Sequence, residues 1–174
     1  MKNIIIIILA VSISIVFSFC SNPTSPEKEN DRFAIYLLSD ESVSTKDVED
    51  KSLNSLEIKE NPVISYTDIL KYDSSICKMY LTKTFNEFFG SDTLTIFSKY
   101  FGNPFIVVAS GERIYLGSFY PLESSWLPKT PLISQSDINN SGMSVKIDYY
   151  NISSGSIDIR KDKRIIEALK QKIM

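Results

Sequence analysis

The feature of this sequence that most constrains its fold is a pair of β-forming runs separated by a two-residue turn. Phe105–Ala109 is apolar throughout, and Arg113–Phe119 follows the dipeptide Ser110-Gly111. A two-residue connection that contains glycine is typical of a β-hairpin, so the two runs are predicted to pair in antiparallel orientation. Gly117 lies inside the second run, where a glycine indicates a bulge or the close approach of another segment.

The alternation of side chains along an extended strand predicts the two faces of the second run. Arg113 and Tyr115 are expected on one face of the sheet, and Ile114 and Leu116 on the other.

Further elements follow from local patterns of apolar residues. Strands are predicted at Arg32–Leu38, Cys77–Leu81, Leu132–Ile133, Val145–Tyr149 and, as a short one, Ile157–Ile159. Apolar residues at helical spacing predict helices over 84–89, 94–101 and 162–173, the last of them capped by Asp162. Ser65 and Asp68 resemble a capping box, so another short helix is expected to begin there.

Residues 1–19 have the organisation of a bacterial lipoprotein signal peptide. Lys2 supplies the positive charge, and Ile4–Val16 is an apolar stretch interrupted only by two serines. The stretch ends in Phe17-Ser18-Phe19-Cys20, which resembles a lipobox, so Cys20 is expected to become the lipidated first residue. The alternative is an ordinary signal peptide or a signal anchor that contains a chance cysteine.

Residues 20–30 are expected to carry the lipid and to tether one domain, residues 31–174, to a membrane. After Cys20 this stretch is polar apart from two prolines, a composition typical of a flexible spacer. A lipid-modified cysteine carries more than one acyl chain, which gives stable anchoring. The expected location is therefore the bacterial cell envelope, facing the periplasm or the exterior, with the membrane as a partner through the anchor.

The composition excludes several classes of function. The chain has 19 Lys and Arg against 21 Asp and Glu, and its formal net charge of −2 argues against a nucleic-acid partner. It contains no histidine, which excludes Ser-His-Asp and Cys-His catalytic groups and His-ligated zinc. With 43% hydrophobic residues the chain can build a packed core, in which Cys77 is predicted to be a small buried hydrophobe.

Together these elements predict an α+β fold, with a mostly antiparallel sheet and two to three packed helices after an N-terminal signal peptide. No pattern in the sequence predicts a cofactor, a metal site or a catalytic residue, since P-loop, dinucleotide-binding, zinc-ligand and nucleophile-elbow patterns are absent. Serine–lysine chemistry needs no histidine, and Ser98 with Lys99, or Ser124 and Ser125 with Lys129, supply the residue types.

The loop after the hairpin is the candidate binding surface. It contains Tyr120, Ser124, Ser125 and Trp126, and loops on a rigid hairpin commonly carry binding residues. The alternative for Trp126 is that it folds back to cover the end of the sheet.

The leading hypothesis is a non-catalytic domain that binds or assists another envelope protein or polymer. The alternative is a histidine-free envelope hydrolase that uses carboxylates or a Ser-Lys pair.

The segment Gly111–Phe119, followed shortly by Ser124-Ser125, resembles a family of uncharacterised bacterial lipoproteins. Arg160–Lys170 is similar to the closing segment of that family, and Tyr72–Ser74 to its central motif. The resemblance implies an envelope lipoprotein and transfers no functional residue. More distantly, the order of helix, strand, hairpin with a glycine turn and strand resembles the periplasmic head subdomain of the SecD translocation protein, which implies only a related fold.

Overall fold

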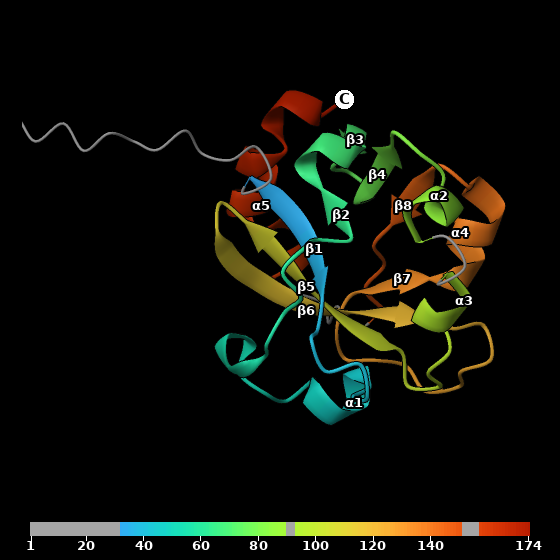
Figure 1. Ribbon diagram of the computed structural model, residues 1–174. Helices are drawn as coiled ribbons and strands as arrows, with labels where there is room; N and C mark the ends of the chain where they lie inside the picture. Colours follow the sequence, from blue (N-terminus) through green and yellow to red (C-terminus); the bar gives the residue numbers. More distant parts are fainter. Residues whose placement is uncertain (1–31, 90–92, 151–156) are drawn as a thin grey trace, which may run out of the picture.

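The computed structural model describes residues 32–89, 93–150 and 157–174 (Figure 1). The predicted signal peptide, the expected lipid-attachment residue Cys20 and the predicted tether lie outside these residues. Within the described part of the chain, no helix combines the length and the apolar character needed to cross a membrane.

The predicted hairpin forms the centre of the larger sheet. Strand β5 (Asn103–Ala109) pairs antiparallel with β6 (Glu112–Tyr120), and Ser110 and Gly111 form the turn between them. These two residues have φ values of 52° and 75°. Two consecutive positive φ values are typical of a type I′ turn, whose twist matches that of the flanking strands. The hairpin prediction is confirmed.

Strand β6 contains a bulge that changes which face its side chains occupy. The pairing register with β5 shifts so that Ile114 is an extra residue. Ile114 packs against the same core as Tyr115, whereas Arg113 donates hydrogen bonds to two carbonyl oxygens of segment 53–56 on the opposite face. The expectation that Arg113 and Tyr115 share a face was wrong, because a bulge reverses the alternation of side chains.

Gly117 marks a close approach and not the bulge. Its partner across the ladder is Phe105, and a β-carbon placed on Gly117 would lie 2.2 Å from the ring of that phenylalanine. The strand therefore needs a residue without a side chain at this point.

Five strands make up the larger sheet, in the order β2-β1-β5-β6-β7. Besides the hairpin, its members are β1 (Phe33–Leu37), β2 (Ile64–Ser65) and β7 (Leu132–Ser134). All neighbouring strands are antiparallel except β6 and β7, which are parallel. The smaller sheet is antiparallel, in the order β3-β4-β8, and contains β3 (Ile69–Asp73), β4 (Lys78–Leu81) and β8 (Ser144–Lys146).

The two sheets are joined on both sides. The one-turn 3-10 helix η3 (Tyr66–Asp68) leads directly from β2 of the larger sheet into β3 of the smaller one. On the other side, the backbones of Leu132 in β7 and Asp148, just beyond β8, exchange hydrogen bonds of 2.7 and 2.8 Å. The strands therefore surround a common core.

The helices are all short. They are α1 (Thr45–Val48), α2 (Phe85–Phe89), α3 (Thr93–Ile96), α4 (Gln135–Ser141) and α5 (Lys163–Ala168), with 3-10 turns η2 (Leu53–Ser55), η5 (Ile159–Lys161) and η6 (Lys170–Lys172). The Asp162 carboxylate accepts a hydrogen bond from the backbone N–H of Arg164 at 2.9 Å, so the predicted cap of α5 is confirmed. The sequence did not predict α4, which follows β7 directly.

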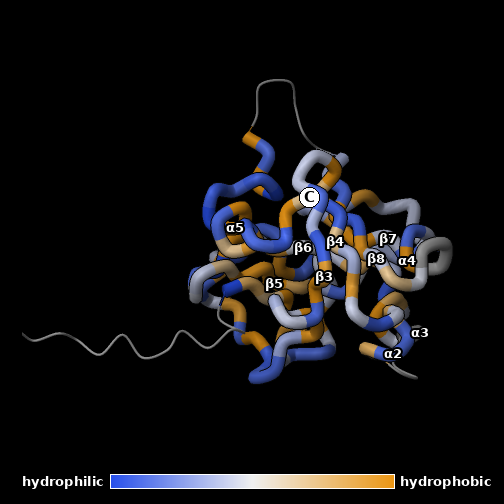
Figure 2. The backbone as a smooth tube through the Cα atoms, turned by 90° about the horizontal axis from the view of Figure 1, so that it is seen from above, coloured by the Kyte–Doolittle hydropathy of each residue, from blue (hydrophilic) through white to orange (hydrophobic). Residues whose placement is uncertain are grey.

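The core has two parts, one on each face of the larger sheet. The main part lies between the sheets and α5 and includes Phe33, Phe105, Phe119, Met79 and Leu169. The smaller part contains side chains from the opposite face, such as Ile106 and Leu116, which pack against α1 and segment 53–58. Figure 2 shows the hydrophobic residues concentrated along the strands in the interior. Together, the sheets and helices confirm the predicted α+β class.

The helix expected after Ser65 is only the single turn η3. A register shift in β3 between Ile69 and Lys71 buries Ile69 and Tyr72 and leaves the residues between them exposed. This three-residue spacing imitates a helical stripe, so the prediction of a helix was wrong beyond the first turn.

The short strand expected at Ile157–Ile159 was also wrong. The turn η5 begins at Ile159, because the Asp158 carboxylate accepts a hydrogen bond from the backbone N–H of Arg160 at 3.1 Å and caps the turn. The second helical segment, expected over 94–101, ends at Ile96, and Phe101 lies outside it.

Candidate functional site

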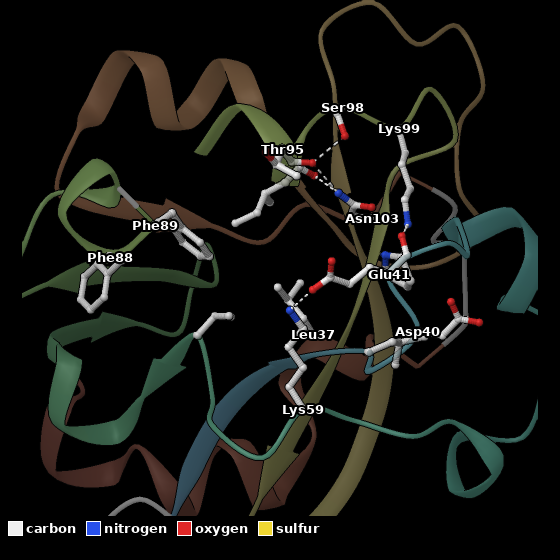
Figure 3. Close-up of a pocket in the computed structure, with 14 residues that line it drawn as sticks. Leu37, Asp40, Glu41, Lys59, Phe88, Phe89, Thr95, Ser98, Lys99 and Asn103 are labelled. Carbon is white, nitrogen blue, oxygen red and sulfur yellow. Dashed lines mark hydrogen bonds and ion pairs between the residues drawn. The ribbon is translucent and has the colours of Figure 1, made fainter. Parts of the chain in front are cut away.

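An open groove of about 480 Å³ lies at the end of β1 (Figure 3). Its walls come from four parts of the chain: the exit of β1 at 37–41, segment 59–63, helix α2, and segment 95–104 around the end of α3. Residues far apart in the sequence therefore meet at one surface.

The floor of the groove is apolar. Leu37, Val63, Phe88 and Phe89 are half-buried there, so their hydrophobic surfaces remain partly accessible to solvent. The ring of Phe85 packs against the ring of Phe89, and the two ring centroids lie 4.2 Å apart.

A local capping interaction explains why α2 begins where it does. The Thr84 backbone N–H and hydroxyl donate to the Glu87 carboxylate at 2.7 and 2.8 Å, and the Glu87 N–H donates back to the Thr84 hydroxyl at 3.3 Å. This reciprocal capping box fixes the first turn of the helix, and so directs Phe88 and Phe89 toward the groove.

Ionised carboxylates form one rim. The Asp40 carboxylate accepts hydrogen bonds from the Ser42 hydroxyl at 2.6 Å and from its backbone N–H at 2.9 Å, and these bonds lower the pKa of Asp40. Glu41 forms an ion pair with Lys59, whose hydrogen bond lowers the pKa of Glu41. Both groups therefore carry negative charge at neutral pH.

Lys99 stabilises the opposite wall. Its ammonium group donates hydrogen bonds to the carbonyl oxygens of Glu41 and Val43, and burial lowers its pKa. The Asn103 side-chain amide donates to the carbonyl oxygens of Thr95 and Ile96 at 2.9 and 2.6 Å, which satisfies the end of α3. The Lys99 bonds connect the segment after α3 to the exit of β1.

The four residues predicted as a binding surface lie together: Tyr120 is the last residue of β6, and Ser124, Ser125 and Trp126 lie in the loop that follows. The Tyr120 hydroxyl donates to the carbonyl oxygen of Ser124, and the Ser124 hydroxyl bonds to the backbone of Trp126 at 3.2 Å. The Ser125 hydroxyl shares a hydrogen bond with the hydroxyl of Tyr100. The polar groups of this loop are thus used in hydrogen bonds that stabilise the conformation of the loop itself.

Trp126 belongs to an aromatic cluster with Tyr100 and Phe101. The rings of Trp126 and Phe101 meet edge to face with centroids 5.7 Å apart, and the ammonium of Lys46 lies 4.4 Å from the centroid of Phe101. Leu127 and Tyr100 are exposed beside the cluster. Because Lys99 lines the groove and Tyr100 follows it in the chain, the cluster and the groove are neighbouring surfaces.

The serines and lysines suggested for serine–lysine chemistry form hydrogen bonds or ion pairs with other groups. The Ser98 hydroxyl donates to the carbonyl oxygen of Thr95 at 2.7 Å, and Lys99 bonds to main-chain oxygens as described. The ammonium of Lys129 lies 3.3 Å from a carboxylate oxygen of Asp50. The hydroxyls of Ser124 and Ser125 bond to the partners given above. In the described part of the chain, therefore, no hydrogen bond joins a lysine of this set to one of its serines.

One pair of carboxylates has the environment of an acid–base pair. Burial and the neighbouring carboxylate of Asp148 raise the pKa of Asp137. Asp148 forms an ion pair with Lys146 at 2.7 Å. Both residues also have structural explanations, because Asp137 lies in the first turn of α4 and Asp148 bonds through its backbone to β7.

Cys77 is buried, as predicted, and has a φ of 53°. Burial raises the pKa of its thiol, and burial together with the neighbouring Cys77 raises the pKa of Tyr72. A thiol with a raised pKa is a poor nucleophile, which agrees with a packing role. Among residues 32–89, 93–150 and 157–174, no three Cys, Asp or Glu side chains are grouped so as to hold a metal ion.

Comparison with protein-family models, with curated proteins and with solved structures gives no match to this chain. The resemblance to a lipoprotein family and to the SecD head subdomain therefore stays a prediction.

The sequence predictions missed the groove. Its carboxylates lie in a stretch for which no element was predicted, and its phenylalanines lie in a stretch for which only a helix was predicted. The one signal in the sequence was the group of three phenylalanines at positions 85, 88 and 89, of which Phe85 is buried and Phe88 and Phe89 stay partly exposed.

Proposed function

We propose that this protein is a non-catalytic binding domain of the bacterial cell envelope, tethered to a membrane by lipid on Cys20. In this proposal, the groove at the end of β1 holds a segment of another envelope component. The observation that carries the proposal is the groove itself, which presents accessible apolar side chains beside ionised carboxylates.

The chemistry of the groove indicates its ligand. Apolar groups on the ligand would cover the half-buried floor, and burial of apolar surface contributes about 25 cal/mol per Å². The rim carries Asp40 and Glu41, and two lysines also line the groove: Lys59, which pairs with Glu41, and Lys99, which bonds to main-chain carbonyls. The surrounding segment 40–60 contains seven acidic residues and three lysines, so its net charge is negative. A segment that combines apolar side chains with Lys or Arg complements both features.

Peptide binding tests the groove. Two labelled peptides of equal length and equal apolar content, one with Lys and one with Glu at the polar positions, are titrated with the mature protein and followed by fluorescence anisotropy. We expect binding of the Lys peptide only, weakened about five- to tenfold in the double variant Asp40→Asn/Glu41→Gln because two rim charges are lost.

The matched control is Glu57→Gln/Glu60→Gln, which removes two exposed charges of the same segment that do not line the groove. It should leave the affinity nearly unchanged. Equal loss in both double variants, or equal binding of both peptides, would contradict a site at the groove.

The intact mass of the membrane-fraction protein tests the anchor. The wild type is expected to begin at Cys20 and to carry acyl chains, and Cys20→Ala is expected to lose them. Retention of residues 1–19 without lipid would instead indicate a signal-anchored protein, and cleavage without lipid a secreted one.

A further inference from the structure

Charge is unevenly distributed along this nearly neutral chain. Segment 40–60 has seven acidic residues and three lysines, whereas the C-terminal segment 158–174 has six Lys and Arg and three acidic residues. The first segment therefore carries a net charge of −4 and the second a net charge of +3.

These two segments lie at opposite ends of β1. Figure 1 shows α5 and the C terminus at the start of this strand and α1 at its end. Six residues separate Arg32, at its start, from Leu38, and at 3.3 Å per residue in a strand this is a distance of about 20 Å. That exceeds the screening length of about 8 Å at physiological ionic strength, so each end acts separately on its surroundings.

The basic end is also where the predicted tether enters the domain. Arg32, the first described residue, donates a hydrogen bond to the side chain of Gln171 in η6 at 3.2 Å. Arg32 and Lys172 both lie over the ring of Tyr66, 5.4 and 4.7 Å from its centroid. The Arg32 carbonyl oxygen accepts from the N–H of Ser110 at 2.8 Å.

Some positive charges at this end pair with carboxylates, whereas others form no ion pair with the residues that the structure describes. Arg160 is paired with Asp158, and Arg164 with Asp162 and Glu112. We name Arg32, Lys161, Lys163, Lys170 and Lys172 the C-terminal basic surface; of these, Lys170 forms an ion pair with Glu167 at 3.2 Å, and both of these side chains are largely exposed to solvent. Figure 2, which views this end, shows hydrophilic residues around α5.

We propose that the C-terminal basic surface lies against anionic phospholipid headgroups of the anchoring membrane, so that the acidic end and the groove point away from the bilayer. The inference rests on the proposed lipid anchor for bringing this end of the domain to the membrane. An anionic surface attracts each nearby Lys or Arg enough to favour contact about fivefold. The same surface repels segment 40–60, so both ends favour one orientation.

Lysine footprinting of the full mature protein in vesicles tests the orientation. The protein is reconstituted in vesicles of neutral phosphatidylcholine, or of phosphatidylcholine with phosphatidylglycerol, and treated with an amine-acylating reagent. Mass spectrometry then gives a modification rate for each lysine. With the anionic lipid, we expect the rates at Lys161 and Lys163 to fall at least threefold, while the rate at Lys51, exposed at the acidic end, stays unchanged.

The protection should disappear in 0.5 M salt, where screening is stronger. Lys170 belongs to the same surface and should be protected in the wild type. Its protection should be lost in the variant Lys161→Glu/Lys163→Glu and kept in the control variant Lys46→Glu/Lys51→Glu. Equal protection at Lys51, or none at Lys161 and Lys163, overturns the proposal.

Flotation of the same vesicles separates this inference from the anchor. A protein that floats with both lipid mixtures but shows no selective protection is anchored and not oriented, which overturns only the inference. A protein that floats with the anionic vesicles alone lacks the anchor but supports the basic surface. Flotation with neither overturns both proposals.

Discussion

At the scale of single residues, the missing side chain of Gly117 lets the ring of Phe105 lie flat across the neighbouring strand. We expect Gly117→Ala to lower the free energy of unfolding by about 1–3 kcal/mol, because the added methyl group overlaps a fully buried ring. Urea denaturation of both proteins measures this difference.

The background Phe105→Leu supplies the control. A smaller side chain leaves room for a β-carbon at position 117, so Gly117→Ala should cost much less there than in the wild type. An equal cost in both backgrounds would show that the ring is not the cause.

Asp162 provides a second prediction at this scale. Hydrogen bonds from the Arg164 side chain, more than any other contact, lower its pKa to about 2, from 3.8. Because the pKa is lower in the folded state, the stabilisation is complete above pH 4 and is lost as the pH falls through about 2.

We therefore expect Asp162→Ala to cost about 1 kcal/mol at pH 7, as is usual for an N-cap, and to cost less near pH 2, where the protonated carboxyl keeps only the neutral part of the cap. Denaturation series at pH 7, 4 and 2 give the comparison. The variant Asp162→Asn keeps a capping side chain and should lose only part of this stability. A cost that does not change with pH would rule out the ionised carboxylate as its source.

At the scale of elements, the turn at Ser110 and Gly111 sets the register of the central hairpin. Both positions have positive φ, which asparagine adopts more readily than serine. We expect Ser110→Asn to raise the thermal midpoint slightly and Ser110→Val to lower it by several degrees, since a β-branched residue is strained there. Differential scanning calorimetry of the three proteins decides this, and a Ser110→Val protein as stable as the wild type would contradict the turn type.

The elements also show where sequence patterns stop being informative. Local chemistry suffices for the hairpin and for the cap at Asp162, because turn and cap residues act on their neighbours. It fails at Ile114 and at Ile69–Tyr72, where a bulge changes the period of burial without a distinctive residue to mark it. The groove was missed for another reason: its floor and rim come from segments that only the sheet topology brings together.

At the scale of the whole molecule, the two sheets are expected to unfold as one unit. They share a core, a continuous segment from β2 to β3, and the backbone bonds between Leu132 and Asp148. The fluorescence of Trp126, the only tryptophan, and far-UV circular dichroism should therefore give the same urea midpoint.

A substitution at the junction sharpens this test. Asp148→Pro removes the N–H that bonds to Leu132, whereas Asp148→Asn keeps it. We expect the proline variant to be less stable than the asparagine variant by about 1–3 kcal/mol. Transitions that already differ between the two probes in the wild type would mean that the sheets are independent.

The way the sheets are joined affects how readily one copy of the domain can add to another. In the part of the chain that the structure describes, β1, β4, β5 and β6 lie between two strands, and the edge strands β3 and β7 each have one further bridge on the outer side, at Ile173 and Asp148. The remaining edge strands, β2 and β8, are only two and three residues long. Strand edges are where chains add to one another and begin to aggregate. If the proposed lipid anchor concentrates the domain on a membrane surface, next to many copies of itself, these short or bridged edges would offer little template for such growth, and contacts with other proteins would be made mainly through side chains.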